Sequence, residues 1–575
     1  MIHHNQLKNR IGTLLFYAVI FLFFVAPILR LIIMSCKGPD GYGLQNFVVL
    51  LHEPRTLKAI INTLIIAVGS SGIATVVGTC MAFVIAYTNF RHKHLLEMLV
   101  LMPFIIPSYI TTLSWAGIIT KRGLINRTAA ALGLGTINIY SIGGILFIVG
   151  VCNIPIVYLS VTHTLRKIPK DLEWASRSCG FSILKTFWKI DVPEAMPAIM
   201  SGAVLSFLAA IDNFSVPAFL GIPAGIPVLS TYIYEKAISF GPQSFPLAAA
   251  LSVLLCAIAI GGTLLEVLVR KGGAMESIKE DFSPRVYIRE SRRKAAEVIL
   301  LLGWGLFDMI PLLVMVSNAF LKNYGLAITR QNLSVDNFEF VCTNTSVLSS
   351  ISNSLILAMV TCTLCILIGT AMAYLKVRRG NHAVVIGEKC AAMTYAIPGI
   401  VLSLSMIFHW TEPLPGIHPG IYGTINILVI AYLTRYLILQ IKGSTTALLS
   451  VNPELEEAVR SSGGNFLMTW RFVLIPLLKK NVLSSSFLIF VSSLTELTLS
   501  SMLASADTKT IGLTIFNFQQ GGEYSLSAAM STLIVAMILV GYGIVNFSAV
   551  LKKEKIESEF VSGTRNAAIR DNAGA

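Results

Sequence analysis

Long apolar segments alternate with short polar segments along nearly the whole chain. Each apolar segment approaches or exceeds the roughly 20 residues that a helix needs to cross a bilayer. The pattern predicts twelve transmembrane helices, at residues 11–33, 59–88, 95–119, 141–164, 197–220, 246–269, 296–318, 350–376, 386–410, 420–442, 481–503 and 526–550. The predicted fold class is therefore an all-α polytopic membrane protein.

Composition supports a lipid environment for most of the 575 residues. The chain is 54% hydrophobic and only 13% charged, whereas about a quarter of the residues in a soluble domain are charged. The net charge of +14 does not indicate a nucleic-acid partner, because the basic residues lie in short segments between apolar ones. The first apolar segment is too long for a cleaved signal and is expected to remain as a helix.

The basic residues also predict the orientation of the chain. If the N-terminus is cytoplasmic, the segments on that side hold roughly three times as many Lys and Arg residues as the opposite segments. Both termini are therefore expected on the cytoplasmic side.

Three pairs of short matches show an internal duplication. Residues 62–67 match 353–358, residues 78–83 match 369–374, and Ile106-Pro107 matches Ile397-Pro398. All three pairs have the same separation along the chain, called here the first offset. Because each half holds an even number of spans, the repeat is parallel. The predicted domains are a first half at 1–269, a cytoplasmic linker at 270–295, a second half at 296–551 and a polar cytoplasmic tail at 552–575.

A polar loop after the fourth span and another after the tenth share a pattern of acidic, small, glycine and proline residues. These loops are residues 165–196 and 443–480. Their glycines and their prolines are separated by the same distance along the chain, called here the second offset. The glycines permit a turn out of a short helix. The residues that carry the pattern are Glu173, Trp174, Ala175, Ser176, Gly180 and Pro193 in the first loop, and Glu456, Glu457, Ala458, Val459, Gly463 and Pro476 in the second.

The pattern resembles the E-A-A-x3-G-x9-I-x-L-P signature of permeases of binding-protein-dependent ABC importers. The second loop follows it closely at Glu457, whereas Trp174 takes the acidic position in the first loop, with Glu173 just before it. The resemblance implies two type I permease halves fused in one chain. It also implies two ATP-binding subunits, expected as a homodimer, that dock on these loops, an extracytoplasmic solute-binding protein, and a bacterial cytoplasmic (inner) membrane. The alternative is a pair of amphipathic surface helices without a partner.

The sequence has no motif for ATP hydrolysis or for a bound cofactor. The phosphate-binding pattern G-x-x-x-x-G-K-[ST] does not occur, so we expect a transport subunit that is not an enzyme, with ATP used by its partners. No metal-ligand spacing is present either. Cys362 and Cys365 lie in an apolar segment and are interpreted as buried apolar residues.

Polar residues inside the spans are candidates for the translocation path, because such residues are costly in lipid. Asp212 and Asn213 lie in the fifth span, and Glu496 lies in the eleventh, where the second offset pairs it with Asn213. We hypothesise that these residues line the path or its outer gate; the alternative is that they face water at the interface. Arg435, in the tenth span, is expected to extend its side chain to the membrane surface.

The cargo is suggested only by resemblance. Residues 221–234 and 509–517 resemble the segments that follow the fifth span of each half in ferric-iron importer permeases. This likeness implies ferric iron, while importers of the same class that carry a phosphonate, a sugar phosphate, a polyamine or thiamine remain alternatives. Two other classes also remain open at this point, a twelve-span secondary transporter and a non-transporting membrane scaffold or sensor.

Overall fold

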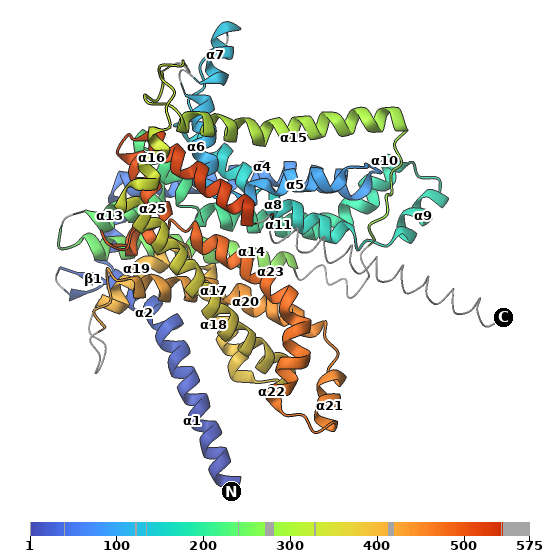
Figure 1. The fold of residues 1–575 in the computed structure, drawn as a ribbon, viewed down its shortest axis with the longest axis vertical. Coiled ribbons are helices and arrows are strands. Elements are labelled where there is room, and N and C mark those ends of the chain that lie inside the picture. The colour runs from blue at the N-terminus through green and yellow to red at the C-terminus, as the bar shows by residue number, and fades with distance from the viewer. Residues whose placement is uncertain are drawn as a thin grey trace.

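The computed structural model describes residues 2–39, 41–120, 123–133, 135–239, 241–270, 281–326, 329–411, 419–541 and 543. The described chain is almost entirely helical (Figure 1). The one sheet in these ranges is a short antiparallel hairpin of β1 (Lys37–Gly38) and β2 (Gly41–Tyr42). The predicted tail 552–575, the linker residues 271–280 and residues 542 and 544–550 of the last predicted span lie outside the described residues.

The first half runs from α1 to α14. Its helices are α1 (Ile2–Ile20), α2 (Ala26–Ser35), α3 (Gln45–His52), α4 (Pro54–Tyr87), α5 (Lys93–Ile105), α6 (Ser108–Ile119), α7 (Leu124–Ala131), α8 (Ile142–Leu165), α9 (Lys170–Ser178), α10 (Ile183–Thr186), α11 (Val192–Asp212), α12 (Ile222–Ala224), α13 (Leu229–Ile238) and α14 (Ser244–Arg270). Short π-helical turns lie at Phe21–Val25, Phe187–Asp191 and Pro217–Gly221.

The second half repeats this order. Its helices are α15 (Glu290–Ala319), α16 (Asp336–Thr343), α17 (Thr345–Arg379), α18 (His382–Ala396), α19 (Gly399–Thr411), α20 (Ile425–Leu449), α21 (Glu454–Ser461), α22 (Phe466–Met468), α23 (Ile475–Leu494), α24 (Ser500–Leu503) and α25 (Ile511–Gln520), with a π-helical turn at Thr469–Leu474. A last long helix covers Tyr524–Gly541.

Ten helices in the described residues are long and apolar enough to cross a membrane. They correspond to ten of the twelve predicted spans. The other two, at 95–119 and 386–410, are bent pairs: α5 and α6 meet at 101°, and α18 and α19 meet at 113°. At these two places the predicted span consists of two helices joined by a bend.

Each bend lies at one of the matched Ile-Pro pairs. Proline disfavours the α conformation of the residue before it, and Ile106 and Ile397 have extended backbones, with ψ of 128° and 134°. The duplicated dipeptide is therefore a duplicated break in the third span of each half.

The fifth and eleventh spans begin earlier than the sequence suggests. The predicted ranges 197–220 and 481–503 are replaced by α11, which ends at Asp212, and α23, which ends at Leu494. Pro193 and Pro476 lie in the first turn of these helices, where a proline costs no hydrogen bond. The apolar residues after Asp212 instead form a separate pair, Pro217–Ala224 and Leu229–Ile238, bent by 71°.

Glycines allow the second and fourth spans of each half to pack closely. A Cβ atom at Gly78 in α4 would lie 2.9 Å from the Ile154 carbonyl oxygen of α8. The matched Gly369 in α17 would place a Cβ atom 2.9 Å from Cβ of Gln440 in α20. Small residues permit such close approach between membrane helices, so the repeat preserves a packing contact as well as a pattern.

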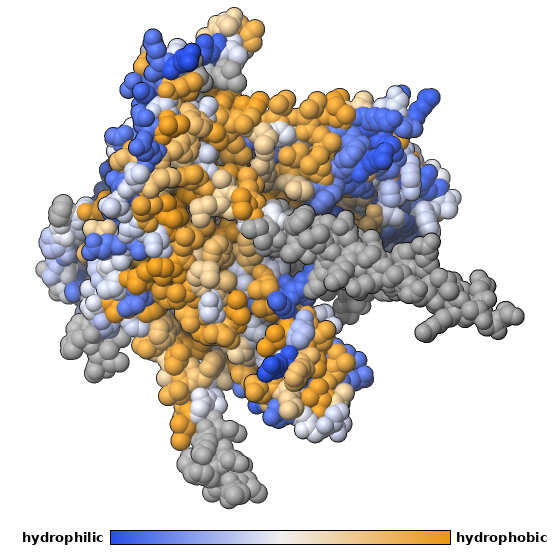
Figure 2. All heavy atoms as spheres, in the orientation of Figure 1, coloured by the Kyte–Doolittle hydropathy of each residue, from blue (hydrophilic) through white to orange (hydrophobic). Residues whose placement is uncertain are grey.

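The outer surface is largely apolar, as a lipid-facing surface should be. Figure 2 shows a broad apolar face over the middle of the molecule, with hydrophilic side chains gathered around α7 and around α9 and α10. Leu264, Ile299 and Leu313 are among the exposed large apolar side chains of the described chain. The short helices α9 and α21 lie at one end of the molecule, away from α7, α13 and α16 at the other (Figure 1).

Candidate functional site

The two loops on which ATP-binding subunits are expected to dock, called here the coupling loops, form matching short helices, α9 and α21. Each helix ends at a glycine in the left-handed region, Gly180 with φ of +82° and Gly463 with φ of +80°. The next residue then donates its N–H back to the helix, from Phe181 to the Ser176 carbonyl at 3.2 Å and from Gly464 to the Val459 carbonyl at 2.8 Å. This 6→1 bond is typical of a glycine-terminated helix and fixes the direction in which the chain leaves it.

An arginine holds the second helix, α21, to the membrane-spanning bundle. Nε of Arg378 lies 2.6 Å from the Glu456 carboxylate, and the same guanidinium donates to the carbonyl oxygens of Leu448 and Val451 at 3.2 and 2.8 Å. The Glu456 side chain is only 5% exposed. A charge-assisted pair with this little solvent contact positions the helix firmly.

An arginine also holds the first helix, α9. Arg285 pairs with the Glu173 carboxylate and donates to the carbonyl oxygens of Leu165 and Ile168 at 3.1 and 2.5 Å. Its side chain is 3% exposed and its guanidinium lies over the Tyr87 ring, 4.7 Å from the centroid. Glu173 and Glu456, which the second offset relates, therefore have the same structural role.

The other residues of the pattern divide into exposed and buried groups. Trp174 and Glu457, which occupy the same position, are exposed, as are Ala175, Ala458, Gly180, Gly463, Pro193 and Pro476. Ser176 is buried, with its hydroxyl 2.9 Å from that of Thr186, and Val459 is half-buried. The substitution of tryptophan for glutamate thus changes the outer surface of α9 and leaves its internal ion pair intact.

A second set of polar residues joins the two halves deep in the bundle. Asp212, the last residue of α11, lies 2.6 Å from Nη2 of Arg435 in α20 and accepts the Gly399 N–H at 2.7 Å. Gly399 begins α19, so the carboxylate also faces the positive end of a helix. The bend at Pro398 creates this position.

The expected extension of Arg435 to the membrane surface is wrong. Helix α20 continues to Leu449, which places Arg435 about 21 Å from that end at 1.5 Å per residue. Its side chain is buried, and it donates to the Ile397 carbonyl at 3.3 Å as well as to Asp212. Arg435 is therefore an interior group that links the halves.

Glu496 and Asn213 occupy equivalent places after the eleventh and fifth spans. The Glu496 carboxylate accepts the Leu499 N–H at 3.0 Å, and the Asn213 side chain accepts the Val216 N–H at 3.0 Å. Both side chains thus cap the segment that follows the span. Glu496 additionally accepts a hydrogen bond from the hydroxyl of Tyr436, the neighbour of Arg435 on α20.

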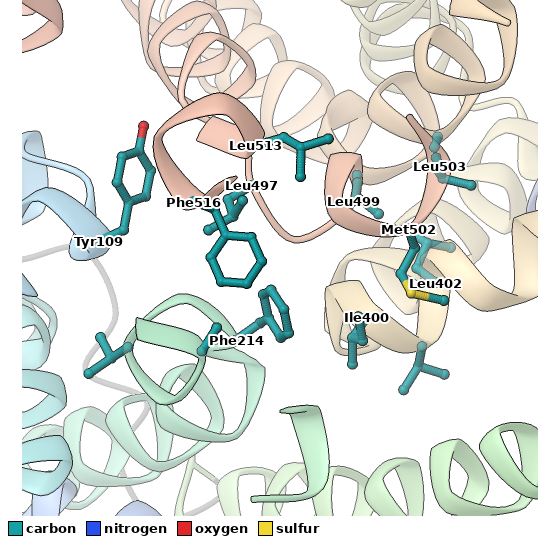
Figure 3. Packing of buried hydrophobic residues seen from close by; sticks show 14 of the residues in the cluster. Tyr109, Phe214, Ile400, Leu402, Leu497, Leu499, Met502, Leu503, Leu513 and Phe516 are labelled. Atoms are coloured by element: carbon teal, nitrogen blue, oxygen red, sulfur yellow. The ribbon is translucent and has the colours of Figure 1, made fainter. Parts of the chain in front are cut away.

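Aromatic side chains pack next to this polar set. Phe214 follows Asn213 and faces Phe516 of the second half, with the ring centroids 6.3 Å apart (Figure 3). Phe219 also packs on Phe516 at 5.5 Å and stacks with Tyr109 at 6.0 Å. The two halves therefore meet through an aromatic contact beside an ion pair of a buried arginine and a partly exposed aspartate.

The contact between the halves is asymmetric. The second offset pairs Asp212 with Thr495 and Arg435 with Cys152. Neither equivalent can form an ion pair, so the Asp212–Arg435 bridge exists once.

The described residues bring together no group of three or more His, Cys, Asp or Glu side chains that could hold a metal ion. Cys362 and Cys365 are both free thiols. Cys365 is buried and Cys362 half-buried, in keeping with their interpretation as apolar residues.

Comparison with known proteins identifies the architecture. Residues 74–271 and 365–555 each match the family of the binding-protein-dependent transport system inner membrane component. The two matches cover more than half of the chain. The chain belongs to this family. It is an ABC importer permease, a membrane channel subunit, with one family domain in each half.

Two curated relatives match this chain along most of its length, and a third matches part of it. The chain is 23% identical to the Fe(3+)-transport system permease protein FbpB 2 of Haemophilus influenzae, over 86% of this chain and 90% of that protein. It is 23% identical to the ferric transport system permease protein FbpB of Actinobacillus pleuropneumoniae, over 92% and 77% respectively. A putative 2-aminoethylphosphonate transport system permease protein PhnU of Salmonella typhimurium is 26% identical, over 40% of this chain and 83% of that protein.

The sequence patterns missed the basic partners of the acidic residues. Arg285 pairs with Glu173 of α9, Arg378 pairs with Glu456 of α21, and Arg435 pairs with Asp212. The position of Arg378 could have been noticed, because it lies in a group of basic residues in the last turn of α17. Nothing in the sequence marks Arg285, since it lies in the linker, 112 residues from Glu173.

Proposed function

We propose that this permease carries ferric iron, driven by two ATP-binding subunits that dock on α9 and α21. The observation that carries the proposal is the pair of arginine-anchored short helices at one end of a duplicated bundle. Each presents an exposed face while its acidic residue is held inside. Such an arrangement transmits a displacement of the short helix to the membrane spans, because the buried ion pair resists independent motion of the helix.

Ferric iron is supported by the names of the two relatives that cover most of the chain. The charge between the halves also suits a cation, since Asp212 pairs with Arg435 while Glu496, bonded to the neighbouring Tyr436, adds a second carboxylate. Carboxylate and phenol oxygens are hard donors, which suit hard cations. Asp212 and Glu496 are accordingly proposed to line the path, with Asn213 as a cap for the segment beside it.

The partners follow from the same arrangement. We propose that the two ATP-binding subunits are identical and that both termini, the linker 270–295 and the tail 552–575 lie on their side of the membrane. The first half is then 1–269, the second half is 296–551, and ATP is hydrolysed by the partners. Identical subunits would meet unlike surfaces, with Trp174 exposed on α9 and Glu457 exposed on α21.

The proposal is tested by reconstitution. The permease is co-purified with its ATP-binding subunit and placed in liposomes with its binding protein. We expect uptake of radioactive iron that requires ATP and saturates with loaded binding protein. ATP-dependent uptake of 2-aminoethylphosphonate without iron uptake would reassign the cargo. Uptake driven by a proton gradient without ATP would reject the mechanism.

The two coupling helices should respond differently to substitution. Glu457→Ala and Gly463→Val are expected to reduce binding-protein-stimulated ATPase activity several-fold, and Trp174→Ala less. Glu457 supplies an exposed charge, and a valine at Gly463 would be strained at φ of +80° by about 1–2 kcal/mol. The ATPase rate of the reconstituted complex measures the effect. Gly180→Val serves as the matched control for strain, and equal losses for Glu457→Ala and Trp174→Ala would contradict the asymmetry.

A further inference from the structure

The two halves obtain the arginine that anchors their coupling helix from different places. In the second half it is Arg378, in the last turn of α17. The first offset pairs Arg378 with Tyr87, in the last turn of α4. The first half therefore has no cation where the second half has its anchor.

Ring contacts confirm that these positions are equivalent. Phe83 packs against Phe187 with centroids 4.8 Å apart, and Tyr374 packs against Trp470 at 5.2 Å. The first offset relates Phe83 to Tyr374, and the second offset relates Phe187 to Trp470, as the sequence repeat requires. Tyr87 and Arg378 lie one helical turn after Phe83 and Tyr374, so they share one place in the two halves.

Arg285 reproduces the contacts of Arg378 from outside the first half. It pairs with Glu173 and donates to the carbonyls of Leu165 and Ile168. The corresponding acceptors of Arg378 are Glu456, Leu448 and Val451. The second offset relates all three pairs of acceptors, so the two guanidinium groups occupy equivalent sites.

The segment that carries Arg285 is fixed to the first half by its backbone. The N–H groups of Arg285 and Val286 lie 2.8 and 2.9 Å from the Tyr87 carbonyl oxygen, and the Asp281 N–H lies 2.8 Å from the Arg166 carbonyl oxygen. Lys170, the first residue of α9, pairs with Asp281 at 2.9 Å. A hydroxyl and a backbone N–H of Ser283, together with Lys170, hold the pKa of Asp281 well below its usual range.

The far end of the segment leads directly into the second half. The Ile288 N–H donates to the Asn89 side chain at 3.0 Å, and Glu290 begins α15, the first span of the second half. A displacement of α9 therefore has a short, bonded route to α15 through Arg285.

We propose that residues 281–289 of the linker are a working part of the first coupling site. Arg285 is a positioning residue that replaces the cation missing at Tyr87, and it connects docking on α9 to movement of the second half. The second coupling site has its anchor within its own half. This inference rests on the proposed coupling role of α9 and α21.

The test uses the full chain in complex with its ATP-binding subunit and binding protein. Arg285→Ala is expected to lower binding-protein-stimulated ATPase activity and iron uptake about tenfold. Arg378→Ala is expected to have the same effect at the equivalent site. The decisive variant is Tyr87→Arg in the Arg285→Ala background, because it moves the guanidinium to the place that Arg378 has in the second half. We expect it to restore at least half of the lost activity.

Controls separate the proposal from a general defect. Arg292→Ala changes an exposed cation in the first turns of α15 and should leave activity and melting temperature unchanged. Glu173→Ala in the Arg285→Ala background should add little further loss, because the two residues form one pair. If Arg285→Ala does not yield folded complex, Arg285→Lys replaces it. The lysine variant should keep the charge and the fold and still lose activity, because one ammonium cannot reach all three acceptors.

The outcomes distinguish the two proposals. Wild-type activity in Arg285→Ala with a loss in Arg378→Ala would overturn the linker inference alone. Wild-type activity in both variants would overturn the coupling proposal itself. A folded complex in which Tyr87→Arg restores no activity would also overturn the claim that Arg285 replaces a cation missing at position 87.

Discussion

Gly78→Leu is expected to prevent stable folding of the first half. Even a single Cβ atom at this position would lie 2.9 Å from the Ile154 carbonyl oxygen, 2.9 Å from Cβ of Val157 and 3.1 Å from the Tyr158 nitrogen. Two of these atoms belong to the backbone of α8 and cannot rotate away. Overpacking of a close contact costs about 1–3 kcal/mol and more where backbone must move, so separation of α4 from α8 is the expected response.

The measurement is the melting temperature and monodispersity of the purified chain in detergent. Gly78→Ala should be destabilised and Gly78→Leu should be recovered mainly as aggregate. Gly72→Leu is the matched control on the same helix, because a Cβ atom there meets nothing within 4 Å and the position is exposed. A normal melting temperature for Gly78→Leu would mean that the α4–α8 contact is looser than the structure shows.

The duplicated patterns in the sequence predict the architecture because the matched residues make equivalent contacts within each half. Gly78 and Gly369 are visible as members of a repeat, and the structure shows why each is small. The Ile-Pro pairs are equally visible, but their match alone does not reveal a bend. Proline disfavours a helical conformation at Ile106 and Ile397, which accounts for the two broken spans. Ile154-Pro155 and Ile310-Pro311 nevertheless lie inside the continuous helices α8 and α15, so an Ile-Pro pair alone does not predict a break.

Contacts between segments far apart in the chain could not be predicted in this way. Asp212 is a candidate because a carboxylate in an apolar span is costly, but its partner Arg435 lies 223 residues later in the other half. No periodicity relates the two, and their equivalents Thr495 and Cys152 carry no charge. The duplication predicts only contacts that occur in both halves, and the ion pair between Asp212 and Arg435 occurs once.

Arg435→Met is expected to destabilise the contact between the halves and to abolish transport. Removing the guanidinium leaves the Asp212 carboxylate with the Gly399 N–H and no cation. Breaking a fully buried pair costs about 3–5 kcal/mol, and the 36% exposure of the Asp212 side chain places the expected loss of unfolding free energy at about 2–3 kcal/mol. The melting temperature of the purified chain reports this loss.

A double variant separates stability from transport. Asp212→Asn in the Arg435→Met background removes both charges and keeps the acceptor for Gly399, so its melting temperature should return close to that of the unmodified chain. If the pair also forms part of the gate, iron uptake by this folded double variant should still fall more than tenfold. The reason is that the two halves lose the ion pair that holds them together next to Phe214 and Phe516. Uptake at the original rate would restrict Asp212 and Arg435 to a structural role. The path would then have to be sought among the remaining polar groups of α20 and its neighbours, beginning with Glu496 and Tyr436.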